Sequence, residues 1–123
     1  MMKVMFVDDR IVEIVNQWRL SGCESNCELL PLLPFDSVEL TGEMVDTFRP
    51  SVIVIGYGSG KPDVTGSDVI QFLRKRGYKG FVVANSGGGA EQFSRDGVEV
   101  DGVVNRNPHD LKMVMENLSL KGM

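Results

Sequence analysis

The 123-residue sequence has little of what most specialised sites require: it holds two cysteines, one histidine and one tryptophan. Two cysteines are too few for a disulfide framework. Three residues separate Cys23 from Cys27, which is not the Cys-x-x-Cys spacing of redox or zinc sites, and His109 is distant in sequence. We therefore expect two buried or half-buried thiols. No Cys/His or Ser/His/Asp set is evident, so nothing predicts an enzyme.

Long apolar runs and an excess of basic charge are also absent. No stretch approaches the ~20 apolar residues of a membrane span. The apolar start, residues 1–7, is ended by Asp8 and Asp9 before it reaches the length of a signal peptide. The net charge is −4, and Arg74-Lys75-Arg76 is the one basic run. These features predict a cytoplasmic protein without a membrane or nucleic-acid partner.

What is present is an alternation of short apolar runs with helical patterns. With 42% apolar and 24% charged residues, the chain is typical of one globular domain over residues 1–123. Apolar or β-branched runs predict strands. The predicted strands are 4–7, 27–33, 52–55, 81–84 and 103–104.

Start and stop signals frame the predicted helices. The first has apolar residues at helical spacing from Ile11 to Trp18, with Asp8 or Asp9 as its cap and Gly22 at its end. The spacing of Asp36 and Glu39 predicts a capping box for the second helix, which Pro50 closes.

The last three helices are predicted in the same way. Val69, Phe72 and Leu73 mark the third helix, which ends at Gly77, and a short fourth helix lies near 90–94. Asn107 as N-cap, with Pro108 at the first helical position, opens the last helix.

Five strands that alternate with five helices predict a flavodoxin-like α/β fold. This is a three-layer sandwich with a parallel sheet of strand order 2-1-3-4-5 and helices on both faces. In such sheets, ligands bind beyond the carboxyl ends of the strands. The residues that follow strands 1, 3, 4 and 5 are Asp8, Asp9, Gly56, Tyr57, Asn85, Ser86, Asn105, Arg106 and Asn107.

Several of these segments, in this order, resemble the receiver domains of response regulators (the CheY-like family). The matching segments are Val7-Asp8-Asp9, the proline-led strand 49–55, Gly66 with Asp68-Val69-Ile70, the strand 80–87 that ends in a serine, and the segment 100–104 before Pro108. The resemblance implies the fold described above and a role in two-component (phosphorelay) signalling. It also implies that Asp8 and Asp9 are candidate Mg²⁺ ligands.

The departures from the family pattern lie at its chemical centre. Gly56 stands where receivers carry the aspartate that is phosphorylated, and Asn107 replaces the family's lysine, with Arg106 one residue earlier. Glycine has no carboxylate to accept a phosphoryl group or to bind Mg²⁺. We therefore interpret the chain as a pseudo-receiver without a phosphoacceptor, with only weak Mg²⁺ binding. Candidates for switch or anion-binding roles are Ser86, Asn85, Arg106 and Asn107.

The predicted output is contact with a protein: a sensor kinase, an output protein or a second copy of the chain. The family's usual contact face maps to about residues 90–118, with Glu91, Phe93, Val104 and Met113 as candidate contacts. The weak helix after three glycines is typical of a surface that orders on binding.

Two alternatives stay open. The chain is a working phosphorelay receiver if another residue, such as Asp63, Asp8 or Asp9, accepts the phosphoryl group. It is a flavodoxin-like binder of a phosphate-bearing small ligand if the glycine-rich loops 56–61 and 86–89 form an anion site.

Overall fold

The computed structural model describes residues 2–31, 37–58, 64–86 and 90–121. Five parallel strands form one sheet in the order β2-β1-β3-β4-β5, which confirms the predicted topology. The strands are β1 (Met2–Val7), β2 (Cys27–Leu29), β3 (Val52–Ile55), β4 (Phe81–Ala84) and β5 (Gly102–Val103).

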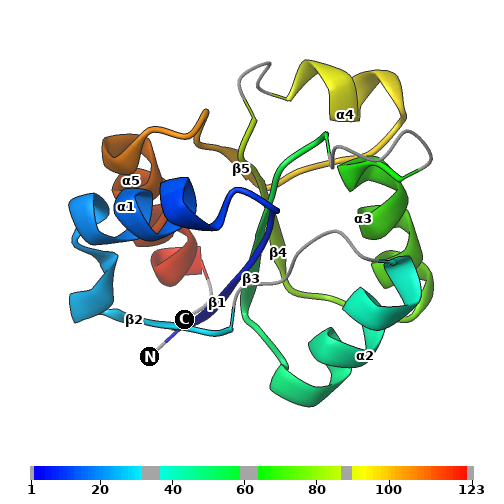
Figure 1. Cartoon of the computed structure of the whole chain (residues 1–123), viewed down its shortest axis with the longest axis horizontal. Coiled ribbons are helices and arrows are strands. Elements are labelled where there is room, and N and C mark those ends of the chain that lie inside the picture. Colours follow the sequence, from blue (N-terminus) through cyan, green and yellow to red (C-terminus); the bar gives the residue numbers. More distant parts are fainter. Residues whose placement is uncertain (1, 32–36, 59–63, 87–89, 122–123) are drawn as a thin grey trace.

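Helices cover both faces of the sheet (Figure 1). α1 and α5 lie together on one face, and α2, α3 and α4 lie on the other. The helices are α1 (Ile11–Ser21), the 3-10 turn η1 (Cys23–Ser25), α2 (Val38–Phe48), α3 (Gly66–Lys75), α4 (Glu91–Arg95) and α5 (Pro108–Lys121). The architecture is the predicted three-layer sandwich.

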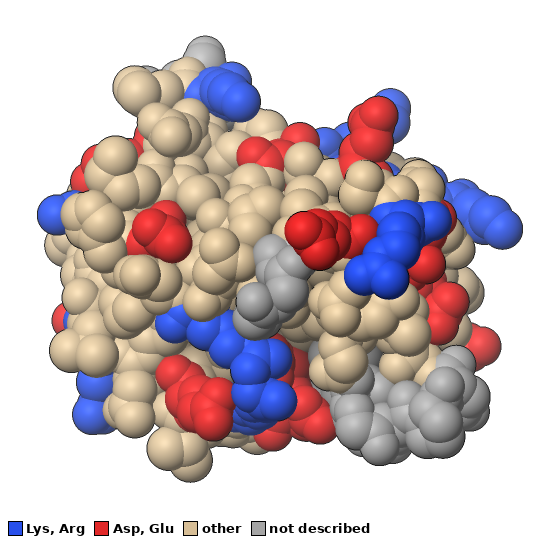
Figure 2. All heavy atoms as spheres, turned by 90° about the horizontal axis from the view of Figure 1, so that it is seen from above, with Lys and Arg blue, Asp and Glu red and all other residues tan. Residues whose placement is uncertain are grey.

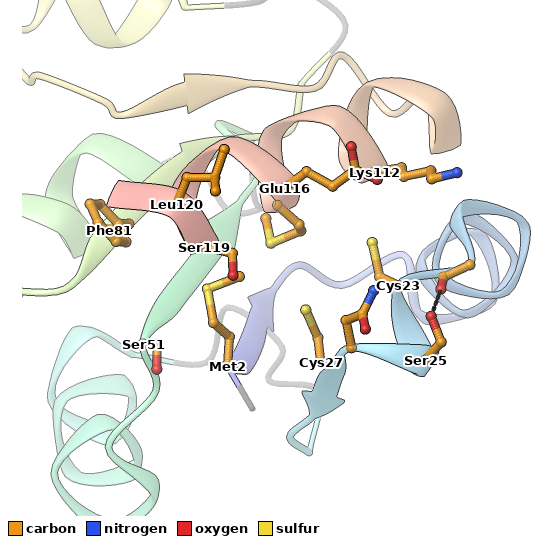
Figure 3. Close-up of a pocket in the computed structure, with 13 residues that line it drawn as sticks. Met2, Cys23, Ser25, Cys27, Ser51, Phe81, Lys112, Glu116, Ser119 and Leu120 are labelled. Atoms are coloured by element: carbon orange, nitrogen blue, oxygen red, sulfur yellow. Dashed lines mark hydrogen bonds between the residues drawn. The ribbon is translucent and has the colours of Figure 1, made fainter. Parts of the chain in front are cut away.

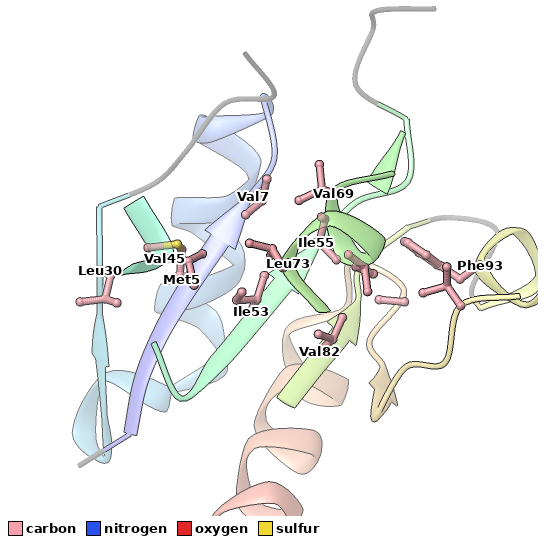
Figure 4. Close-up of a cluster of buried hydrophobic side chains, with 13 residues drawn as sticks. Met5, Val7, Leu30, Val45, Ile53, Ile55, Val69, Leu73, Val82 and Phe93 are labelled. Carbon is pink, nitrogen blue, oxygen red and sulfur yellow. The ribbon is translucent and has the colours of Figure 1, made fainter. Parts of the chain in front are cut away.

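Two apolar cores, one on each face, hold the layers together. Successive side chains of a strand point to opposite faces, so Val4 and Phe6 of β1 face α1 and α5, whereas Met5 and Val7 face α2 and α3. Figure 4 shows the second of these cores. β3 is buried throughout, as expected for the β-branched central strand of a parallel sheet.

The helix boundaries confirm some predicted caps and correct others. Gly22, in the left-handed conformation at φ 75°, ends α1 as predicted. The predicted cap at Asp8 or Asp9 is wrong, because the N-cap of α1 is Arg10 and no side chain caps it. Asp8 lies two residues earlier, and its carboxylate accepts a hydrogen bond from the Arg10 backbone N–H.

The caps of α2 and α3 also differ from the sequence pattern. Ser37, not Asp36, is the N-cap of α2, and its hydroxyl accepts a hydrogen bond from the Leu40 backbone N–H at 3.0 Å. Asp36 lies outside the described residues. A complete capping box, which is not among the predicted caps, occurs instead at α3 between Thr65 and Asp68.

Strands 2 and 5 differ in extent from their predicted ranges. β2 ends at Leu29, although the Leu30 N–H still donates to the Val4 carbonyl. Pro31 follows and has no N–H to continue the ladder, and residues 32–33 lie outside the described residues. β5 begins one residue earlier than predicted, at Gly102, and Val104 follows it.

Burial corrects two of the four candidate contacts on the predicted partner face. Phe93 and Val104 are completely buried, so neither side chain is available to a partner. α4 is only five residues long, and its one aromatic side chain packs on the sheet core and edge-to-face on Tyr57. Glu91 is exposed and Met113 is 47% exposed, so these two remain accessible.

Within the described part of the chain, no helix is both long and apolar enough to cross a membrane.

Candidate functional site

The strand register brings the predicted site residues to one edge of the sheet. Val7 pairs with Ile55, and Ile55 pairs with Ala84. The next residue of each strand, Asp8, Gly56 or Asn85, therefore lies at the same level beyond the carboxyl ends. Parallel pairing thus brings these three residues to one edge of the sheet.

Asp8 occupies the space beside Gly56. Its side chain is only 4% exposed, and its Oδ1 accepts a hydrogen bond from the Arg10 N–H at 2.9 Å. A Cβ atom placed on Gly56 would lie 2.7 Å from the other oxygen, Oδ2. Any side chain at position 56 would therefore have to displace the Asp8 carboxylate.

Burial also changes the acidity of Asp8. Loss of water around the carboxylate raises its pKa above the usual value, and the neighbouring Asp9 charge adds to the effect, while the Arg10 N–H acts against it. Burial thus makes the ionised form of Asp8 less favourable in the folded protein than in water.

The start of α3 closes the other side of Gly56. A Cβ atom on Gly66 would lie 2.3 Å from the Gly56 carbonyl oxygen, so only glycine fits there. The Gly66 N–H also donates to the Tyr57 carbonyl at 2.7 Å. The position that follows β3 is thus enclosed by backbone on one side and by Asp8 on the other.

Asn85 is the centre of a buried hydrogen-bond network. Its amide exchanges two hydrogen bonds with Gln17 of α1: Nδ2 donates to Gln17 Oε1 at 3.0 Å, and Oδ1 accepts from Gln17 Nε2 at 3.2 Å. Oδ1 also accepts from the Arg106 backbone N–H at 2.8 Å. Asn85 therefore ties β4 to α1 and to the loop before α5, and these hydrogen bonds occupy both ends of its amide.

Gln17 is not among the residues that the sequence pattern predicts for this site. The available signal was a polar residue inside the buried stripe of α1, between Ile14 and Trp18, which are both buried. A buried amide requires a partner, and here the partner is 68 positions away.

The remaining anion-binding candidates have different roles. Asn107 caps α5, because its Oδ1 accepts from the backbone N–H groups of His109 and Asp110. Ser86 is buried directly after Asn85. Arg106 has a left-handed backbone, at φ 60°, and its buried Nε has no hydrogen-bond partner among the described residues. It lines a cavity of about 290 Å³ together with Asp8 and Gln17.

Asp8 and Asp9 provide only part of the Mg²⁺ centre that the resemblance implies. Across residues 2–31, 37–58, 64–86 and 90–121, no group of three or more His, Cys, Asp or Glu side chains is placed to hold a metal. Asp9 is exposed, Asp8 already accepts a hydrogen bond, and Gly56 provides no side-chain ligand. Because Mg²⁺ is usually held by one or two carboxylates together with waters and substrate oxygens, weak binding at Asp8 and Asp9 stays a prediction.

Tyr57, which follows Gly56, links the site to α4. Its hydroxyl donates to Asp96 Oδ2 at 2.7 Å, and its ring packs edge-to-face on Phe93 at a centroid distance of 5.3 Å. The hydrogen bond lowers the pKa of Asp96 and raises that of Tyr57. The loop after β3 is thereby fastened to the segment after α4.

Some predicted features cannot be placed. Asp63, the proposed displaced acceptor, lies outside the described residues, as do positions 59–61 and 87–89 of the two glycine-rich loops.

In Figure 2, which views the molecule from above, basic and acidic side chains are interspersed on the visible face. The described residues on this face therefore form no continuous basic patch.

The fold is that of response-regulator receiver domains. The chain is similar to a response regulator receiver domain protein from Clostridium thermocellum (16% identity, TM-score 0.73, 99% of this chain and 97% of that chain covered). It is also similar to the chemotaxis response regulator CheY4 of Vibrio cholerae (18%, TM-score 0.74, 96% and 98%). A third match is a DNA-binding response regulator of the LuxR family from Staphylococcus aureus (16%, TM-score 0.75, 96% and 98%).

No model of a known protein family matches the chain, and no curated protein sequence matches it. The likeness to receivers therefore lies in the fold.

We predict that Asn85→Ala lowers the free energy of unfolding by about 2–3 kcal/mol, because it leaves the buried Gln17 amide and the Arg106 N–H without partners. Denaturant unfolding measures this loss. Asn16→Ala, at an exposed position on the same helix as Gln17, is the control and should change stability by less than about 0.5 kcal/mol. Equal effects of the two substitutions would show that the network contributes nothing.

We also predict that Asp8→Asn raises the melting temperature at neutral pH. The pKa of Asp8 is raised in the folded state, so its ionised form opposes folding above the folded pKa. This cost disappears below the unfolded pKa of ~3.9. The stability gap between variant and wild type should therefore be largest near pH 7 and shrink as the pH falls towards 4. Asp9→Asn, which removes the same charge from an exposed position, should show no such gain.

Proposed function

We propose that this chain is a receiver-like signalling domain that acts through protein contact and without phosphorylation. One distance supports this proposal most directly: a Cβ atom at position 56 would lie only 2.7 Å from Asp8 Oδ2. The acceptor carboxylate is missing, and a different carboxylate occupies the space it would need.

The surroundings of this contact support a domain held in one arrangement. Asn85, at the end of β4, is engaged by Gln17 and by the Arg106 backbone. Tyr57, at the end of β3, is held by Asp96. Asn85 already has its Oδ1 and one N–H of its amide engaged within this network, and no lysine precedes Pro108 to bind a phosphoryl group.

The partner in this proposal is a protein of two-component signalling: a sensor kinase, an output protein or a second copy of the chain. Glu91 and Met113 are the accessible candidates on the predicted contact face. The domain functions as a binding module in the cytoplasm, with no catalytic step and no nucleic acid or membrane as its partner.

The test is incubation with acetyl phosphate, and separately with beryllofluoride, in the presence of Mg²⁺. We expect no acid-labile phosphoryl adduct by intact mass, and no shift in the amide NMR signals of Asp8, Gly56 or Asn85. A receiver domain that retains its aspartate, treated in parallel, shows that the reagents are active.

A stoichiometric, acid-labile adduct would overturn the proposal. The variants Asp63→Asn, Asp8→Asn and Asp9→Asn would then identify the acceptor, because only the variant that lacks it loses the adduct. The phosphorelay alternative would replace the pseudo-receiver interpretation.

A further inference from the structure

A second cavity lies at the opposite end of the sheet from the residues described above. It has a volume of about 1100 Å³ and is bounded by α5, η1 and the first residues of β1 and β2. Four of its lining residues carry sulfur: Met2, Cys23, Cys27 and Met115. Figure 3 shows the side chains of Met2, Cys23 and Cys27 reaching from three different elements towards the space beneath α5.

The two thiols are held in place by the local backbone. Cys23 opens η1 directly after the left-handed Gly22, and its N–H donates to Ser21 Oγ at 3.1 Å. Ser21 Oγ in turn donates to the Trp18 carbonyl at 2.6 Å. Cys27 is the first residue of β2 and pairs with Met2 of β1. Both thiols are free and buried.

The chemistry of this sulfur cluster selects a soft cation. Thiolate and thioether ligands favour Cu(I), whereas Mg²⁺ and Ca²⁺ require oxygen ligands. A tetrahedral zinc site needs four thiolate, imidazole or carboxylate ligands. Among the residues that the structure describes, not even three such side chains are grouped for a metal. Cu(I) is a monovalent d¹⁰ ion that two thiolates can hold, with weaker bonds from thioethers. It therefore fits this set of sulfur ligands.

We propose that this cavity binds one Cu(I) ion through the thiolates of Cys23 and Cys27, with the thioethers of Met2 and Met115 completing the sulfur environment. On binding, two S–H bonds lose their protons to solvent and two Cu–S bonds form. Copper stays in the +1 state, so no oxidant or reductant is consumed. The resulting bis-thiolate complex carries one negative charge, and the cavity lining holds one residue of each sign, Lys112 and Glu116.

The proposal is independent of the receiver-like function and concerns the other end of the molecule. Burial raises the pKa of both thiols, so in the absence of metal they are protonated and weakly reactive. When a metal cation binds, it displaces both protons and keeps the two sulfur atoms as thiolates.

The test is an anaerobic competition of the reduced full chain with bathocuproine disulfonate for Cu(I). We expect one Cu(I) per chain, displaced by Ag(I). The double variant Cys23→Ser/Cys27→Ser should bind at least about a hundredfold more weakly, and Met115→Leu about tenfold more weakly. Met113→Leu, at an exposed methionine of the same helix outside the cavity, should bind as wild type does.

X-ray absorption of the wild-type complex tests the ligands without any substitution, so a variant that fails to fold does not remove the test. A first shell of sulfur alone supports the proposal. A shell of nitrogen or oxygen overturns it. Equal Cu(I) affinity of wild type and the double serine variant, with both folded by circular dichroism, also overturns it, as does one copper bridging two chains.

Discussion

The close approach of the Asp8 carboxylate to Gly56 is the contact on which the arrangement of the sheet edge depends. Because residue 56 has no side chain, the end of β1 can place Asp8 Oδ2 where a Cβ atom would otherwise lie. The Gly56 carbonyl then faces Gly66 so closely that α3 must begin with a residue lacking Cβ. Two glycines and one buried acid are thus in close contact where β1, β3 and α3 meet.

Neutral hydrogen bonds then fix the neighbouring elements. In receiver domains, the carboxyl ends of the strands carry charged groups, namely acidic side chains, a metal ion and a phosphoryl group. Here Asn85 and Gln17 satisfy one another, and Asn85 also holds the loop that leads into α5. Each such bond contributes only about 1 kcal/mol net, but leaving a buried partner unpaired costs more. The network therefore stabilises one arrangement of α1 and of the loop that leads into α5.

The sequence predicts the layers of the fold better than its contacts. A β-branched run such as Val52–Ile55 predicts a strand that is buried on both faces. This signal is local, so it can be recognised without knowing which elements lie beside the strand. The glycine at position 56 is equally visible in the sequence, whereas the Asn85 to Gln17 pairing joins positions 68 apart and has no local signal. The burial of Phe93 was missed for a related reason: α4 is too short for periodicity to show which side faces the core.

A double-mutant cycle between Gly56 and Asp8 tests this account most directly. Gly56→Ala should lower the free energy of unfolding by about 1–3 kcal/mol in the wild-type background, since the new methyl group meets Asp8 Oδ2. In an Asp8→Ala background the same change should cost at least about 0.5 kcal/mol less. Gly58→Ala is the matched control, because a Cβ there meets nothing within 4 Å. An identical cost of Gly56→Ala in both backgrounds would contradict the claim that Asp8 fills the acceptor's place.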